Sequence, residues 1–208
     1  MPRILITAGP TREYLDPVRF LSNASSGKMG AALAKAVLNV DYEVTIVAGP
    51  VACDYPQKAK VIQVTTTDEM LHACMRIFPE CIGAIGAAAP CDFRPKNVSS
   101  EKIKKGSDFS MTIELVATPD IFAELGRIKR PDQWLVPFAL ETAENGKRHA
   151  LDKLQKKNGD WIILNGPESM LGDDAKVEIL TSTGATLATF SGSKESVASQ
   201  IISLINSR

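Results

Sequence analysis

Short, continuously apolar runs alternate along this chain with segments of helical periodicity, and this alternation restricts the fold more than any other feature. The apolar runs cover residues 3–7, 43–49, 60–64, 82–89, 134–140 and 161–166. The helical segments cover about 29–40, 68–78 and 149–157, and a further helix begins near 118. Strands that alternate with helices predict βαβ units, and parallel strands are apolar throughout because both faces are buried. We therefore expect an α/β, Rossmann-like fold with a mostly parallel sheet flanked by helices.

Two regions depart from this alternation. Residues 90–118 are polar and lysine-rich and then alternate in character over 111–116, which predicts an exposed flap that ends in a strand. The tail predicts a hairpin around Thr183-Gly184 and a final helix capped near Ser193. Because no repeat or linker-like stretch divides the sequence, we expect one domain over residues 1–208.

Composition excludes several classes of function. Basic and acidic side chains balance at 24 each, which argues against a nucleic-acid partner. The four cysteines form no CxxC pair and the two histidines lie far apart in sequence, so we expect neither a zinc site nor other protein-held metal. The chain has no apolar run of about 18 residues and no signal-peptide pattern at its start. We expect a cytoplasmic protein without a membrane segment.

The long loop after the first strand is the first candidate ligand site, because ligands bind at the carboxyl ends of parallel strands. It reads "TAGPTREYLDPVRFLSNASSGKMG". Its single Gly9 lacks the glycine spacing of a dinucleotide loop, and Met29 stands where a phosphate loop needs Ser or Thr. We expect the helix to start near Ser25 or Ser26, so that Ser25, Ser26 and Gly27 offer backbone N–H groups to an anion. An ordinary serine cap explains the same residues equally well.

Later loops offer further candidates. The small residues of "GAIGAAAPCDF", Gly86 among them, would let a ligand approach the backbone, although close helix packing is an equal alternative. Lys102 and Lys104 would share one face of an extended strand, whereas a lysine cluster is more often a solvated face. A helix is expected to begin with Thr118 as its N-cap and Pro119 at its first position.

Paired lysines and an aromatic side chain complete the set. Lys153 and Lys157 stand at i and i+4 of a predicted helix and could clamp phosphates together, although exposed helix lysines are the commoner explanation. Phe138 near the end of an apolar run could stack on a base or simply pack in the core. Lysines, an amide and helix ends suit positioning and electrostatic catalysis on phosphates.

Taken in order, five stretches resemble the phosphopantothenoylcysteine synthetase of coenzyme A biosynthesis over about residues 3–166. They are "ILITAGPTREYLDPVRFLSNASSGKMG", "AAAPCDFRPKNVSSEKIKK", "TPDI", "PFALET" and "KLQKKN". The resemblance implies that the carboxylate of 4′-phosphopantothenate attacks the α-phosphate of CTP and releases pyrophosphate. The amine of cysteine then attacks the acyl-cytidylate, which yields an amide and CMP. Magnesium is expected to accompany the triphosphate.

The resemblance also implies roles for individual residues. Asn23 would contact the acyl-cytidylate, and Lys102 would be needed to form it. Arg19 would meet the intermediate, beside the anion donors of Ser25, Ser26 and Gly27. The implied nucleotide contacts are Gly86, Ala87, Ala88, Asp92, Lys102, Pro119, Asp120, Ile121, Phe122, Phe138, Lys153 and Lys157.

The resemblance implies an assembly as well. In the family the lysine-rich flap reaches across a homodimer, so a homodimer is expected. Because the motif begins at residue 3, a stand-alone synthetase is implied, without the flavin-dependent decarboxylase domain and without flavin. A separate decarboxylase is then a partner to test.

Departures from the family pattern leave alternatives open. Pro90, Cys91, Pro137 and Gly166 differ from the usual motifs, so the choice between CTP and ATP stays open. An NAD(P)-binding Rossmann module and a lysine-rich interaction domain are competing hypotheses. If Asn23 serves the acyl oxygen, Asn23→Asp is expected to impair turnover more than nucleotide binding.

Overall fold

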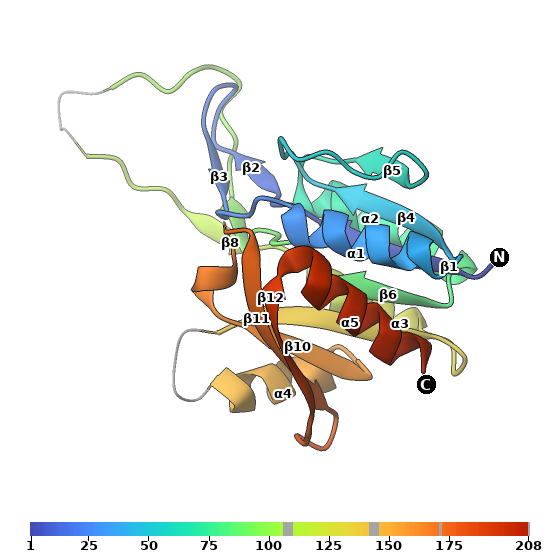
Figure 1. The fold of residues 1–208 in the computed structure, drawn as a ribbon. Coiled ribbons are helices and arrows are strands. Elements are labelled where there is room, and N and C mark those ends of the chain that lie inside the picture. The colour runs from blue at the N-terminus through green and yellow to red at the C-terminus, as the bar shows by residue number, and fades with distance from the viewer. Residues whose placement is uncertain (106–109, 142–145, 171, 208) are drawn as a thin grey trace.

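The computed structural model describes residues 1–105, 110–141, 146–170 and 172–207. Its main sheet has eight strands, ordered β12-β11-β10-β9-β6-β1-β4-β5 (Figure 1). The strands are β1 (Arg3–Ala8), β4 (Glu43–Ala48), β5 (Lys60–Gln63), β6 (Gly83–Gly86), β9 (Trp134–Leu140), β10 (Trp161–Asn165), β11 (Asp174–Thr181) and β12 (Thr186–Ser193).

The sheet confirms the predicted mostly parallel arrangement. From β5 to β10 all neighbouring strands are parallel, and β11 and β12 add an antiparallel edge. The chain runs outward from β1 to β4 and β5 and then returns to the other side of β1 at β6. This is the doubly wound order, in which ligands bind where the winding direction reverses. That position lies between β1 and β6.

Five helices cover the two faces of the sheet. They are α1 (Lys28–Asn39), α2 (Thr67–Ile77), α3 (Ile121–Ile128), α4 (Gly146–Lys156) and α5 (Lys194–Asn206). Helices α1 and α5 lie side by side on one face (Figure 1) and pack with Ile4 and Ile6 of β1. Leu5 of β1 points to the opposite face and packs with α2 and α3, and a smaller cluster there includes α4. The strand therefore buries successive side chains in different cores, which explains its continuous apolar run.

An arm projects beyond the carboxyl ends of β1 and β6 (Figure 1). We use "arm" for the described parts of residues 12–22 and 93–117. The first part is a hairpin of β2 (Arg12–Tyr14) and β3 (Phe20–Ser22), and the second pairs β7 (Phe93–Pro95) with β8 (Leu115–Ala117). The flap predicted over 90–118 belongs to this arm, and its residues 106–109 lie outside the described residues.

Several local expectations need correction. The expected strand over 111–116 is confined to β8, and the expected strand over 82–89 ends at Gly86. Helix α1 begins at Lys28 rather than near Ser25 or Ser26, because Gly27, at φ 75°, is its N-cap in the left-handed region. Two short 3₁₀ helices, Phe78–Glu80 and Pro167–Ser169, join larger elements.

The predicted cap of the final helix is confirmed, and the predicted cap of α3 is wrong. The hairpin around Thr183-Gly184 and the final helix are confirmed, and the Ser193 side chain accepts from the Ser196 N–H as a cap. The N-cap of α3 is Asp120, not Thr118 as expected, and Pro119 precedes the cap. Thr118 instead donates its hydroxyl to the Cys91 carbonyl.

Within the described residues no helix is both long and apolar enough to cross a membrane.

Candidate nucleotide site

A cavity of about 150 Å³ opens at the carboxyl ends of β1, β6 and β9, beside the start of α3. Thr7 of β1 and Gly86 of β6, which pair in register, both line it. The cavity therefore lies where the winding of the sheet reverses. It brings together nine residues predicted to contact a nucleotide: Gly86, Ala88, Asp92, Pro119, Asp120, Ile121, Phe122, Phe138 and Lys157.

The glycine at the end of β6 makes room for an aromatic ring. A Cβ at Gly86 would lie 2.7 Å from two ring atoms of Phe122. Phe122 is 6% exposed and packs against the α2–α3 core. The expectation was that small residues here let a ligand approach the backbone. The glycine at position 86 also makes room for the Phe122 ring, which itself lines the cavity.

Negative charges outnumber positive charges among the side chains that line the cavity. Lys157 Nζ lies 2.5 and 2.7 Å from the two carboxylate oxygens of Asp120. Asp120 also accepts from the Ala123 N–H, which caps α3. With Asp92 included, the charged residues that line the cavity are two carboxylates against one ammonium. A polyphosphate at the cavity mouth would therefore need cations from elsewhere.

Asn23 holds the loop that follows β6. Its amide nitrogen Nδ2 donates to the Ala89 carbonyl at 3.2 Å and to the Pro90 carbonyl at 2.9 Å. Pro90 lines the cavity. Both hydrogen atoms of this amide are thus directed at the nucleotide-side loop, a contact that the sequence did not indicate.

The next residue of that loop, Cys91, is fixed through its backbone. Its N–H donates to the Thr11 hydroxyl at 2.8 Å, and its carbonyl accepts from the hydroxyls of Thr118 at 2.5 Å and Thr67 at 3.3 Å. Burial raises the pKa of the Cys91 thiol, so the group stays neutral and donates weakly to the carbonyls of Thr11 and Leu21. Three threonines, two of them buried, and a thiol therefore position the loop without contributing charge.

The predicted anion donors at the start of α1 lie at a different hollow. Ser25 and Ser26 line an open depression of about 810 Å³ with Arg12 and Val51. The Ser26 hydroxyl donates to the Met170 carbonyl rather than capping the helix. A Cβ at Gly27 would lie 3.0 Å from the Cys53 sulfur, so close packing as well as its φ angle favours glycine. The structure does not place these residues on the nucleotide cavity itself.

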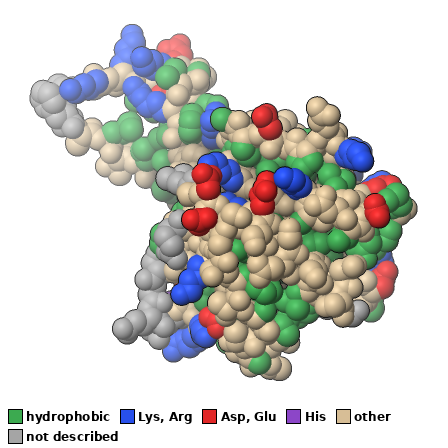
Figure 2. Space-filling view, in the orientation of Figure 1, with side chains coloured by type: hydrophobic (Ala, Val, Ile, Leu, Met, Phe, Trp, Pro, Cys, Tyr) green, Lys and Arg blue, Asp and Glu red, His purple; other side chains and the backbone are tan. Residues whose placement is uncertain are grey.

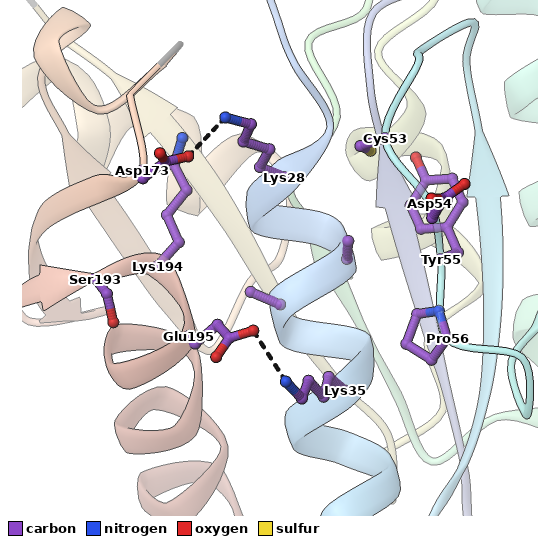
Figure 3. A pocket seen from close by; sticks show the side chains of 12 residues that line it. Lys28, Lys35, Cys53, Asp54, Tyr55, Pro56, Asp173, Ser193, Lys194 and Glu195 are labelled. Carbon is purple, nitrogen blue, oxygen red and sulfur yellow. Dashed lines mark hydrogen bonds and ion pairs between the residues drawn. The ribbon is translucent and has the colours of Figure 1, made fainter.

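A third hollow, of about 680 Å³, is lined by α1, the start of α5 and residues 53–56 (Figure 3). Lys28 meets Asp173 at 2.6 Å and Lys35 meets Glu195 at 2.9 Å. The buried Lys194 donates to the carbonyls of Met170 and Gly172, and burial followed by repulsion from Lys28 lowers its pKa. Each lysine that lines this hollow already has a partner, which explains Lys28 as a structural contact.

Four other predicted residues do not line the nucleotide cavity. Ala87 packs against the core and donates its N–H to the Thr7 carbonyl. Lys153 pairs with Glu141 at 2.7 Å. Arg19 and Lys102 lie on the arm, where the Lys102 residue is exposed. The lining residues that were not predicted as contacts are Thr7, Pro90, Cys91, Thr118 and Pro137.

The described part of the chain offers no set of side chains that could hold a metal ion without other ligands. No group of three or more His, Cys, Asp or Glu side chains there could hold an ion.

Sequence comparisons place the chain among proteins of pantothenate metabolism. The profile of the family described as "DNA/pantothenate metabolism flavoprotein C-terminal domain" matches residues 2–208. A protein named "Cysteine/Cysteine sulfinic acid decarboxylase", from an unknown prokaryotic organism, is 50% identical over 164 residues, which cover 78% of this chain and 45% of that protein. The chain spans less than half the length of the first curated relatives it matches.

Two solved structures share the fold over nearly the whole chain. The C-terminal domain of a protein named "Coenzyme A biosynthesis bifunctional protein CoaBC" is 36% identical, with a TM-score of 0.80, and the match covers 98% of this chain and 93% of that one. A mutant of Cab2 in complex with phosphopantothenate-cysteine has a TM-score of 0.81. At 17% identity, with 99% of this chain and 87% of that one covered, the second structure supports the fold alone.

Proposed function

Because the chain belongs to the family described as "DNA/pantothenate metabolism flavoprotein C-terminal domain", we propose that it is a phosphopantothenoylcysteine synthetase, which joins 4′-phosphopantothenate to cysteine. CTP activates the carboxylate as an acyl-cytidylate and releases pyrophosphate, and the amine of cysteine then displaces CMP. The observation that carries this proposal is the cavity at the β1–β6 reversal, which gathers nine of the predicted nucleotide contacts. The likeness to the C-terminal domain of the CoaBC protein agrees with it.

The cavity size favours a particular placement of the nucleotide. About 150 Å³ is well below the roughly 300–1,000 Å³ of pockets that enclose whole ligands. The base and ribose would enter between Phe122, Phe138 and Asp92, and the triphosphate would remain at the mouth. Magnesium would arrive with the triphosphate and neutralise part of its charge.

The arm would supply the missing positive charge. Lys102 and Lys104 lie on it, and Figure 2 shows basic side chains together with hydrophobic ones on this projection. Its exposed apolar residues include Val18, Phe20, Phe93, Val98, Met111 and Leu115. Clustered exposed apolar side chains indicate a protein interface. We therefore propose a homodimer in which the arm of one copy brings Lys102 to the cavity of the other.

Within this arrangement Asn23 would serve the acyl intermediate. Its amide now donates to the carbonyls of Ala89 and Pro90, so one of these bonds would give way to the acyl oxygen, where an amide donor can stabilise developing negative charge. Lys102 would act as a point charge on the phosphates during formation of the acyl-cytidylate. The stand-alone form, the cytoplasmic location, the lack of flavin and any separate decarboxylase partner stay predictions.

The test is a set of parallel incubations of the purified chain. CTP or ATP is supplied with magnesium, 4′-phosphopantothenate and cysteine, each omitted in turn, and pyrophosphate, nucleoside monophosphate and amide product are measured. The proposal requires amide formation that depends on CTP and both acceptor substrates. Carbon dioxide release from cysteine alone would instead favour the activity in the name of the 50% identical relative. Stabilisation by NADPH but not by CTP would favour a dinucleotide-binding module.

A further inference from the structure

A buried carboxylate stands in the turn of the arm's first hairpin. Asp16 is 0% exposed although the arm projects from the body of the protein. One of its oxygens, Oδ1, accepts from the backbone N–H groups of Val18 and Arg19, each at 2.8 Å. This bonding of an Asp side chain to N–H groups two and three residues ahead stabilises the turn itself.

The second oxygen of Asp16 faces a distant part of the chain. Oδ2 accepts from Arg19 Nη1 at 2.9 Å and from the Ile103 N–H at 3.1 Å. The same Arg19 nitrogen donates to the Ile103 carbonyl at 2.9 Å. Both backbone groups of Ile103 are therefore held by one ion pair, and the flap segment that contains Ile103 is fastened to the hairpin.

A second contact lies a few residues earlier in the same segment. The Ser99 N–H donates to the Leu15 carbonyl at 2.9 Å. Residues 99–103 are thus fixed at both ends to the turn that begins at Leu15. Lys102 lies between these two contacts and immediately before the clamped residue.

We propose that Asp16 is a positioning residue for Lys102, which it serves by clamping the Ile103 backbone to the hairpin turn. This inference rests on the proposed function, in which Lys102 acts on the nucleotide. A carboxylate suits the task because its two oxygens accept several hydrogen bonds at once, here two in the turn and two toward Arg19 and the flap. Without the clamp the lysine-bearing segment would have to be ordered anew in each catalytic cycle.

The diagnostic substitution is Asp16→Asn. An asparagine has one oxygen, so it cannot accept at both ends. With the oxygen in the turn, its NH₂ group faces the Ile103 N–H and the Arg19 guanidinium, all of them donors. The link to the flap is then lost while the turn can persist. Asp41→Asn, at an exposed position just after α1, makes the same change of side chain outside the arm and is the matched control.

Two measurements separate the clamp from the catalytic role. The first is limited trypsin digestion, with cleavage followed at the lysines of residues 101–105. We expect Asp16→Asn to accelerate this cleavage about tenfold, the order of effect for loss of one charge-assisted hydrogen bond, and Asp41→Asn to leave it unchanged. An unchanged rate in Asp16→Asn would overturn the clamp, whether or not the protein is a ligase.

The second measurement is a double-mutant cycle on CTP-dependent pyrophosphate release. We expect Asp16→Asn to slow release in the native background and to have no further effect in the Lys102→Ala background, because the positioned group is already gone. Independent, additive effects would overturn the positioning role even if trypsin confirms the clamp. If the native chain releases no pyrophosphate, the proposed function and the role of Lys102 both fail, and the digestion alone decides on the clamp.

Discussion

Asn23→Asp tests the two roles proposed for this side chain, which are support of the loop after β6 and stabilisation of the acyl oxygen. The sequence predicts a loss of turnover that exceeds the loss of nucleotide binding. The structure adds two hydrogen bonds from the Asn23 amide to the carbonyls of Ala89 and Pro90. Aspartate has no hydrogen to donate there and places a negative charge against two carbonyl oxygens. We therefore expect the nucleotide loop to lose its support and CTP affinity to fall as well.

The size of the effect follows from those two bonds. Each contributes about 0.5–1.5 kcal/mol net, so removing both costs about 1–3 kcal/mol. Since about 1.4 kcal/mol is tenfold in an equilibrium constant, the CTP dissociation constant should rise by roughly 5- to 150-fold. Repulsion in Asn23→Asp is screened because Asn23 is exposed, so Asn23→Ala should give an effect of similar order.

The assay is titration calorimetry with CTP and magnesium in the absence of 4′-phosphopantothenate. Asn39→Asp, an exposed position at the opposite end of α1, introduces the same charge away from the cavity and should bind normally. Turnover at saturating CTP then reports the separate role at the acyl oxygen. Native affinity for CTP in both Asn23 variants would refute the argument that this amide supports the loop.

Three further predictions concern packing, assembly and pH. Gly86→Ala should lower unfolding stability by about 1–3 kcal/mol, an overpacking penalty, because its Cβ would lie 2.7 Å from the Phe122 ring; urea denaturation measures this, and a stability equal to the native one would contradict the packing argument. Phe93→Asp should convert a dimer to a monomer in sedimentation, whereas Leu187→Asp, an exposed residue on β12, should not; an unchanged Phe93→Asp dimer would refute an arm-mediated interface. For Asp16, burial favours a higher pKa, but backbone N–H bonds and Arg19 lower it below its ordinary 3.8; its stabilising effect should be full above that pH and lost as pH falls toward the lowered pKa. The stability difference between the native chain and Asp16→Asn should therefore shrink below pH 4, and a difference that grows in acid would contradict this sign.

The parallel sheet could be predicted because its central strands β1, β4 and β6 are buried on both faces and read as apolar runs. The start of α1 could not, since Ser25, Ser26 and Gly27 are all acceptable caps locally. Residues distant in sequence decide which of the three is the cap, because Cys53 and Val51 crowd the place that a side chain at Gly27 would occupy. Likewise Thr118 and Asp120 both suit a helix cap, and the Cys91 carbonyl, distant in sequence, engages the first of them.

The resemblance named nine of the residues that line the cavity, because their motifs are local in sequence, but it did not name the groups that support them. That these residues bind a nucleotide stays a prediction. The β2–β3 hairpin was missed because strands of three residues carry too little pattern. The turn at Asp16 was not predicted, and nothing local indicated that this side chain would bind the backbone of Ile103.

The central claim is that this chain activates 4′-phosphopantothenate with CTP before cysteine reacts, and a rapid-quench experiment without cysteine tests it most directly. We predict a burst of pyrophosphate equivalent to the number of sites, dependent on 4′-phosphopantothenate, with CMP released only when cysteine is added. Pyrophosphate formation that does not require 4′-phosphopantothenate, or amide formation without any nucleotide, would contradict the account.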